Sequence, residues 1–241
     1  ITYEIESGNS SVLKNLESTC EINPSPETLS IIQDKFTQKK FLDDNGIPVT
    51  RFSEISTKNE LDSKINEFGL PILLKTRRDA YDGRGNFKID SVEQVSDALK
   101  IFDGKSLMVE QFVEFEMEVS VIAARSTTGE IQTFPVVENI HDDNILKMTI
   151  APARISTEIS KKAEDIAHKT MEVLHGAGVF GIEMFVTKNK QVLINEIAPR
   201  VHNSGHHTLQ SSKISQFEQH LRAILGMKLG DTELIHPTIM Y

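Results

Sequence analysis

Apolar residues recur along the chain at two spacings, and these spacings separate helices from strands. Residues 1–6 alternate between apolar and polar side chains, which predicts a strand. Residues 25–27 supply an N-cap serine, a first-turn proline and an acidic residue, and apolar side chains at helical spacing follow. The pattern predicts one helix from there to the break at residues 45–48.

From residue 71 the pattern becomes apolar with a period of two, which indicates strands. Residues 79–86 read as a flexible turn between two of these strands, and residues 127–130 read as a hairpin tip. A short helix surrounds residues 95–99. The predicted strands cover residues 71–75, 87–89, 107–112, 117–125 and 131–137.

The clearest helix begins at Ser156 or Thr157 and ends at the glycines of residues 176–178. Two strands follow, at residues 179–186 and 191–198. A final helix over residues 215–225 is expected to turn Phe217, Leu221 and Ile224 inward. Mixed helices and hairpins without a steady β-α-β alternation predict the α+β class, with two lobes built around antiparallel sheet.

The amino-acid composition and net charge argue against some classes of function. The 241 residues include 39% hydrophobic and 25% charged residues, as in ordinary globular proteins. A net charge of −9 argues against sequence-independent binding to nucleic acid and against binding to an anionic membrane. The single cysteine, Cys20, fits a reducing compartment and otherwise acts as a small filler. No stretch approaches the roughly 18 apolar residues of a membrane span, and no signal peptide is recognisable, so we expect a cytoplasmic protein.

Two glutamates are expected to face each other in the hairpin that ends at residue 198. If Asn189 and Lys190 form a two-residue turn, Glu183 lies directly opposite Glu196. Facing carboxylates repel unless a cation lies between them. Oxygen ligands without a cysteine partner favour Mg²⁺, with a nucleotide as co-ligand. The alternative is two solvated glutamates on an exposed face.

Lys75 ends an apolar strand, where an unpaired ammonium group would lose its hydration at considerable cost. A phosphate oxygen would supply the anion it needs, and the glycine-bearing turn at residues 81–85 could fold its N–H groups over the same phosphates. Taken alone, that turn is ordinary Asp-Gly hairpin chemistry. Of Lys35, Lys39 and Lys40, two are expected to be solvated charges.

A link between the lobes is predicted at residues 110–113, after an apolar strand. Its backbone could hold a planar base, while Glu118 could accept hydrogen bonds from ribose hydroxyls. The alternative is two rim glutamates beside a core phenylalanine. His141 is, on its own, most simply a loop residue.

Several motifs, at residues 75–86, 110–111, 118–120, 151–154, 181–185 and 195–205, together resemble a known family. They resemble the ATP-grasp ligases that make N5-carboxyaminoimidazole ribonucleotide in purine biosynthesis, and more closely the synthetase part of fungal phosphoribosylaminoimidazole carboxylases. Order and spacing agree from about residue 1 to about residue 235.

The resemblance implies an ATP-grasp fold with nucleotide between the lobes, ATP and Mg²⁺ as cofactors, and bicarbonate and aminoimidazole ribonucleotide as substrates. ATP would phosphorylate bicarbonate, and the carboxyphosphate or its CO₂ would carboxylate the exocyclic amine of the ribonucleotide. It also suggests a homodimer for the full-length protein. Positioning and charge neutralisation would do most of the catalysis.

The resemblance also assigns roles to residues. Glu183 and Glu196 would bind Mg²⁺, and Asp82, Arg84 and Arg200 would be catalytic. Bicarbonate or the ribonucleotide would contact Tyr81, Asp82, Arg84, Arg154, Arg200, His202 and Asn203. ATP would contact Lys35, Lys75, Ala80, Tyr81, Asp82, Gly83, Arg84, Gly85, Asn86, Glu110, Gln111, Phe112, Val113, Glu118, His141, Asn195 and Glu196.

The same resemblance predicts that the chain is a fragment. Residues 1–24 would be the end of an N-terminal domain and a linker, residues 25–235 the ATP-grasp domain with a small lid lobe at about 51–113, and residues 236–241 the start of a further region. The family's Gly-rich N-terminal domain, its C-terminal Lys/Arg cluster and the fungal mutase part are missing. We therefore expect nucleotide binding but poor complete turnover from this chain alone.

Two alternatives remain open at this level. One is a sister ATP-grasp enzyme, such as a formate-dependent glycinamide ribonucleotide transformylase or a biotin carboxylase. The strings at residues 81–85 and 202–205 favour the aminoimidazole enzyme. The other is a non-catalytic nucleotide-binding module that kept the fold.

Overall fold

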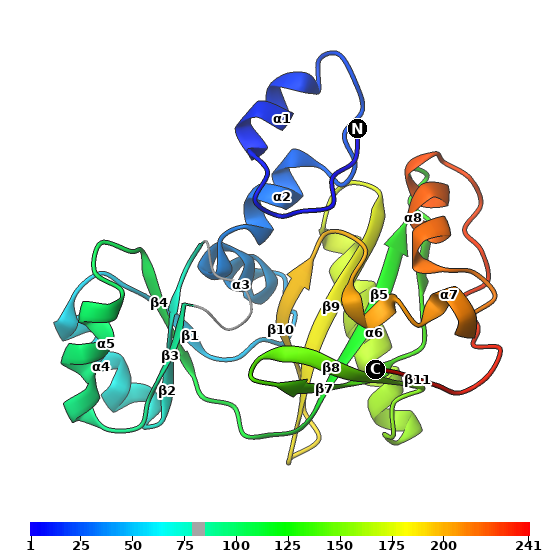
Figure 1. The fold of residues 1–241 in the computed structure, drawn as a ribbon. Helices are drawn as coiled ribbons and strands as arrows, with labels where there is room; N and C mark the ends of the chain where they lie inside the picture. The colour runs from blue at the N-terminus through cyan, green and yellow to red at the C-terminus, as the bar shows by residue number, and fades with distance from the viewer. Residues whose placement is uncertain (79–84) are drawn as a thin grey trace.

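The computed structural model describes residues 1–78 and 85–241 and shows two lobes, each built on its own antiparallel sheet (Figure 1). The small lobe covers residues 52–111. Its four strands lie in the order β1 (Phe52–Ile55), β4 (Leu107–Gln111), β2 (Ile72–Thr76) and β3 (Asn86–Ile89). The predicted α+β class is confirmed.

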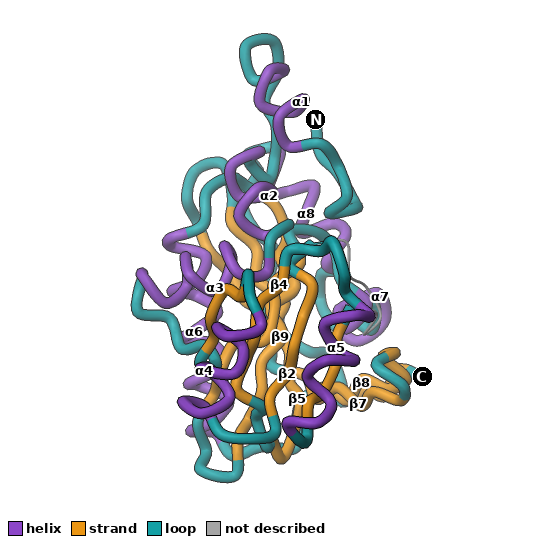
Figure 2. Tube along the Cα trace, turned by 90° about the vertical axis from the view of Figure 1, so that its left-hand side faces the viewer, coloured by secondary structure: helices purple, strands orange, loops and turns teal. Residues whose placement is uncertain are grey.

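Strand alternation gives the small lobe two chemically different faces. Helices α4 (Lys58–Phe68) and α5 (Val95–Ile101) cover the outer face, which is turned toward the viewer in Figure 2. Ile72, Leu74 and Val109 pack into that core, where each is 0% exposed. Because side chains alternate along a strand, Lys75 and Glu110 point to the opposite face, toward the large lobe.

The large lobe contains the seven-stranded sheet. Its continuous path is β10, β9, β5, β7, β8 and β11, and β6 pairs with β5 beside this path. The bounds are β5 Phe115–Arg125, β6 Ile131–Thr133, β7 Val137–Asp142, β8 Ile145–Ala151, β9 Gly178–Thr187, β10 Val192–Ala198 and β11 Thr238–Met240.

Helices cover both faces of this sheet. Helix α6 (Thr157–Val173), capped by Ser156 as predicted, packs on the face that carries Val121 and Ile182. Helix α8 (Gln216–Ile224) packs on the other face, against Val179 through Ala223. The short elements η2 (Asn203–Gly205) and α7 (Thr208–Ser211) lie between β10 and α8 in the chain.

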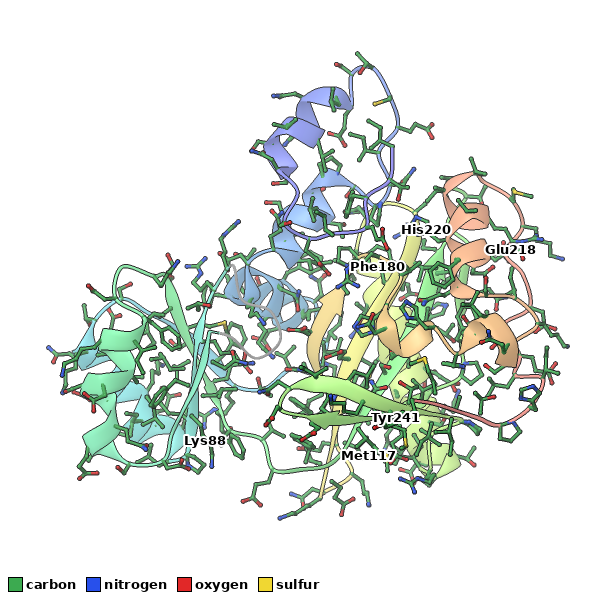
Figure 3. All side chains as sticks on the ribbon, viewed as in Figure 1. Lys88, Met117, Phe180, Glu218, His220 and Tyr241 are labelled. Atoms are coloured by element: carbon green, nitrogen blue, oxygen red, sulfur yellow. The ribbon has the colours of Figure 1, made fainter. Side chains whose placement is uncertain are left out.

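Residues 1–6, all within the described part, form no strand, so that prediction is wrong. The alternation of apolar and polar residues was not enough to predict a strand, because a strand must also pair with a neighbouring strand. Individual polar contacts instead connect this segment to the rest of the protein. Thr2 Oγ1 lies 2.8 Å from His220 Nε2, and Figure 3 labels His220 on α8. The N–H of Asn23 donates to the carbonyl of Ile1 at 2.9 Å.

Two other predicted elements need correction. The helix expected from residue 25 to residue 45 is two helices, α2 (Pro26–Ile32) and α3 (Lys35–Asp44). Asp34 separates them, because its carboxylate caps the N-terminus of α3. The strand expected at residues 131–137 divides into β6 and the start of β7.

The predicted inward face of the last helix is also wrong. Leu221 is 54% exposed, whereas the polar residues Gln219 and His220 are buried with Ala223. The remaining helices are α1 (Ser10–Leu16) and the 3₁₀ turn η1 (Val92–Gln94). Among the described helices, none is both long enough and apolar enough to cross a bilayer.

One buried histidine makes stability depend on pH. Burial lowers the pKa of His207 from 6.5 to about 4, while its Nδ1 lies 2.6 Å from Ser211 Oγ. The unfolded chain therefore binds the proton first, so stability is kept above pH 6.5 and is lost as the pH falls from 6.5 toward 4. At pH 5 the expected loss is roughly 2 kcal/mol.

Urea unfolding of His207→Gln between pH 7 and pH 5 checks this expectation. The variant should lose that part of the pH slope. His168→Gln, which changes an exposed histidine on α6, should keep it. Equal slopes in His207→Gln and in the unmodified chain would contradict the assignment.

Candidate nucleotide and metal site

Glu183 on β9 and Glu196 on β10 are directly paired across the hairpin, so their side chains leave the same face of the sheet. The predicted pairing is confirmed, but the predicted turn is wrong. Near the turn Val192 pairs with Val186, one position away from the register that a two-residue turn would give. A bulge between Ile194 and Glu196 shifts the register and restores the pairing.

Cations lie beside both carboxylates. Lys35, the first residue of α3, places its Nζ 3.0 Å from Glu196 Oε2. His202 places its Nε2 3.3 Å from Glu183 Oε1. The Lys35 ammonium group holds the pKa of Glu196 well below its usual range, and Glu196 in turn raises the pKa of Lys35. The position between the lobes therefore brings two carboxylates together with the Lys35 ammonium group and the His202 imidazole.

A buried charge cluster joins the two lobes. Glu110 Oε1 lies 3.1 Å from Lys75 Nζ, and its other oxygen lies 3.4 Å from Lys39 Nζ. The three side chains are only 4%, 7% and 2% exposed, respectively. Thr50 Oγ1 also donates to Glu110 at 3.0 Å, and Lys39 donates to the carbonyl of Ile194 on β10 at 3.4 Å. Small-lobe strands thereby connect to α3 and to the large sheet.

Burial and charge act in opposite directions within this cluster. Burial lowers the pKa of Lys39 to about 8, against the attraction of Glu110. Burial alone would raise the pKa of Glu110, but Lys39 and Lys75 lower it to about 2. Two ammonium groups share one carboxylate, so the cluster keeps an excess of positive charge. The anion that we expected for Lys75 is, in this structure, Glu110.

The remaining nucleotide candidates surround this point. Gln111 ends β4 and residues 112–114 form the link to β5, and the Lys88 ammonium lies 4.7 Å from the Phe112 ring centroid. Glu118 on β5 lies opposite Asn139 of β7, and its Oε2 lies 2.6 Å from His141 Nδ1. The adjacent carboxylate of Glu118 raises the pKa of His141. His141 therefore belongs to a strand beside the carboxylates and is not a loop residue.

The residues assigned to the second substrate are less closely grouped. Arg200 Nε lies 2.8 Å from Glu6 Oε1, and the guanidinium also donates to the carbonyl of Val201. Arg154 is bound to Glu138, with 2.8 Å between Nε and the carboxylate. The side chain of Arg154 is 64% exposed. Asn203 begins η2 and is exposed.

Part of the predicted lid lies outside the described residues. This part comprises Ala80, Tyr81, Asp82, Gly83 and Arg84. Of the two lid residues that are described, Asn86 pairs with Lys75 across β2 and β3, and the carbonyl of Gly85 accepts from the N–H of Thr76 at 2.8 Å.

Three residues of this region were missed by the sequence analysis. Lys39 sits within a helix rich in charged residues, so no signal separated it from a solvated lysine. Glu6 was assigned to a strand and not to an ion pair with Arg200. Gly181 was named only as part of a motif, yet a Cβ there would lie 2.5 Å from the Cβ of His202. The glycine allows η2 to approach β9 closely enough for His202 to reach Glu183.

Similarity to known proteins identifies the family of this chain. A family profile described as ATP-grasp domain matches residues 40–217, about three quarters of the chain. The chain belongs to the ATP-grasp family. The matched residues include Lys75 and Glu110 of the buried cluster and both facing glutamates, and the two-sheet architecture is therefore that of an ATP-grasp protein.

Two curated relatives show which ATP-grasp proteins this chain is similar to. The chain is 43% identical over 240 residues to the N5-carboxyaminoimidazole ribonucleotide synthase of Bacillus subtilis, covering 100% of the chain and 63% of the relative. It is 42% identical to the phosphoribosylaminoimidazole carboxylase of Saccharomyces cerevisiae, covering 95% of the chain and 41% of the relative. The chain therefore spans less than two thirds of the length of these curated relatives.

Solved structures agree with this ATP-grasp assignment. The N5-carboxyaminoimidazole synthase from Aspergillus clavatus, in complex with ADP and 5-aminoimidazole ribonucleotide, superimposes with a TM-score of 0.93 at 36% identity. That comparison covers 99% of this chain and 63% of the other chain. The synthetase from Thermotoga maritima gives a TM-score of 0.87 at 45% identity, with coverages of 98% and 61%.

Proposed function

We propose that this chain is the ATP-grasp part of an enzyme that carboxylates 5-aminoimidazole ribonucleotide with bicarbonate and ATP, giving N5-carboxyaminoimidazole ribonucleotide for purine biosynthesis. The observation that carries the proposal is the pairing of Glu183 with Glu196 beside Lys35 and the buried Lys75. The names of the relatives support the choice of substrate.

The two glutamates fit a magnesium ion that also binds nucleotide phosphates. Mg²⁺ prefers near-octahedral oxygen coordination and is commonly held by one or two carboxylates, with phosphate and water completing its shell. Within residues 1–78 and 85–241 no cluster of three or more acidic, histidine or cysteine groups could hold a metal by itself. Glu183 and Glu196 alone would therefore leave positions open for ATP.

The protein groups would act mainly by positioning and by neutralising charge. Lys35 and Lys75 would contact the phosphates, and Mg²⁺, when bound, would balance the charge on the transferring phosphoryl group. The backbone of residues 110–113 would hold the adenine, and Glu118 the ribose. His141 and Asn195 would complete that pocket, with residues 80–86 covering the phosphates.

The second substrate would lie beyond the glutamates, on the side of η2. Arg200 is the best-placed candidate, because its guanidinium is already engaged by the carboxylate of Glu6 and could hold an anionic substrate in the same way. His202 and Asn203 would lie beside it. Tyr81, Asp82, Arg84 and Arg154 stay proposals from the resemblance alone.

The rest of the proposal concerns the complete protein. Bicarbonate as the carboxyl donor, a homodimer and the division at residues 24 and 235 come from the resemblance, and the lone Cys20 fits a cytoplasmic location. A fungal parent would add a mutase part, giving the carboxylase name of the yeast relatives. Turnover by residues 1–241 alone is expected to be poor.

Phosphate release by the complete protein tests the function. We expect release from ATP to depend jointly on bicarbonate and 5-aminoimidazole ribonucleotide, with omission of either lowering the rate at least about 10-fold. Release driven by glycinamide ribonucleotide with formate would replace the proposal by the sister ligase. Tight ATP binding without release under any of these conditions would favour a silent nucleotide-binding module.

A further inference from the structure

A row of buried polar side chains crosses the large sheet behind Glu183. Thr149 Oγ1 lies 3.3 Å from Asn139 Oδ1, and Asn139 Nδ2 lies 2.9 Å from Ser120 Oγ. Ser120 Oγ lies 2.8 Å from Ser204 Oγ, which is 2.9 Å from His202 Nδ1. Thr149, Ser120 and Ser204 are 0% exposed, and Asn139 is 5% exposed.

Strand register explains why these groups meet. Ser120 on β5 lies directly opposite Glu183 on β9, and Asn139 on β7 lies opposite Thr149 on β8. Directly paired residues share a face of the sheet, and this is the face opposite α6. Apolar neighbours on that side, including Ile122 and Ala124, keep water away from the row. Polar groups buried in such surroundings need defined partners.

The chain of hydrogen bonds has one consistent direction. At its end, the carboxylate of Glu183 can only accept, and the backbone N–H of Ser204 points at His202 Nδ1 at 3.4 Å. Nδ1 is therefore an acceptor, and Nε2 carries the proton. The hydroxyl of Ser204 then donates to Nδ1 and accepts from Ser120, and Ser120 accepts from the amide of Asn139.

The opposite direction would create two clashes. It would turn the lone pair of His202 Nε2 toward the carboxylate of Glu183. It would also direct an Nδ1–H against the backbone N–H of Ser204. Both contacts are repulsive, so the side-chain amide of Asn139 is fixed with its oxygen toward Thr149.

We propose that Ser204, Ser120, Asn139 and Thr149 are positioning residues that hold His202 with its Nε2–H toward Glu183, whose Oε1 lies 3.3 Å from Nε2. His202 then orients a carboxylate and is neither a metal ligand through Nε2 nor a proton acceptor. The functional consequence rests on the proposed role of Glu183 in binding Mg²⁺. Hydrogen-bonded partners of a metal-binding carboxylate fix its orientation and thereby raise metal affinity.

Nitrogen NMR of ¹⁵N-histidine in the 241-residue chain tests the proposed direction. His202→Gln assigns the signals. At a pH where the ring is neutral, we expect His202 to carry its proton on Nε2, with Nδ1 showing the shift of a hydrogen-bonded acceptor. Ser204→Ala should move the Nδ1 signal toward its unbonded value, whereas Ser126→Ala, a buried serine bonded to Thr128, should leave it unchanged.

Two NMR outcomes would overturn the proposal. One is a dominant Nδ1–H form in the unmodified chain. The other is an unchanged His202 spectrum in Ser204→Ala when thermal unfolding shows that the variant is folded. Neither measurement needs turnover, so a failure of the proposed function would leave this test intact.

A second readout connects the row to metal binding in the complete protein. Ser204→Ala should raise the Mg²⁺ concentration for half-maximal phosphate release about 10-fold, while the KM for 5-aminoimidazole ribonucleotide changes much less. A merely structural role would affect both constants or neither. An unchanged magnesium dependence in a folded Ser204→Ala protein would count against the proposal.

Discussion

Replacing Glu196 by glutamine in the complete protein should lower the rate of ATP-dependent phosphate release roughly 100-fold to 1000-fold. The amide keeps the size of the side chain but removes the negative charge that would hold a divalent cation and that now pairs with Lys35. Loss of metal-based charge neutralisation in the transition state costs several kcal/mol, and each 1.36 kcal/mol changes the rate about tenfold.

Glu116→Gln provides the matched control for that measurement. Glu116 lies on β5 and pairs with Lys190 at the surface, with 44% of its side chain exposed. This variant should release phosphate at the unmodified rate. If Glu196→Gln also kept the full rate, Glu196 would have no role in the chemistry, whatever its pairing with Glu183.

Replacing Glu110 by glutamine should destabilise the protein by about 3–5 kcal/mol. The substitution leaves Lys39 and Lys75 buried without a carboxylate between them. A buried charge that loses its partner is far more costly than a broken surface pair. Because the cluster also joins β4 to α3 and β10, we expect the contact between the lobes to weaken with it.

Urea unfolding at pH 7 measures this effect, with Glu158→Gln as control. Glu158 forms an exposed pair with Lys162 on α6, so its variant should unfold close to the unmodified protein. A second substitution, Lys39→Met, made in the Glu110→Gln background should recover part of the loss, since it removes one of the two unpaired ammonium groups. An unfolding midpoint of Glu110→Gln equal to that of the control would show that the cluster contributes nothing.

The sequence predicted most of the large-lobe architecture because local signals and burial agreed there. Ser156 capped α6 as expected, and β4, β5, β9 and β10 lie close to their predicted positions, whereas most of β7 and all of β8 were not predicted. The pairing of Glu183 with Glu196 also emerged from the pattern, although the bulge at Asn195 had no signal in the sequence. The actual turn shifts the strand register by one position from the predicted register, and the bulge shifts it back, so the two glutamates still pair.

What could not be predicted depends on partners far away in the chain. Lys39 is buried only because Glu110, about 70 positions later, folds against it from the other lobe. Helical spacing placed Leu221 inward, but α8 is rotated so that Gln219 can donate to the carbonyl of Gly230. The ion pair between Glu6 and Arg200 likewise joins distant segments.

The most direct test of the central claim is the affinity for ATP, measured by calorimetry with and without Mg²⁺. The claim is that Glu183 and Glu196 share the divalent ion that anchors the triphosphate. In the unmodified chain we expect Mg²⁺ to tighten ATP binding at least about 10-fold, and in the double variant Glu183→Gln/Glu196→Gln we expect no tightening. An equal gain from Mg²⁺ in both proteins would contradict the claim.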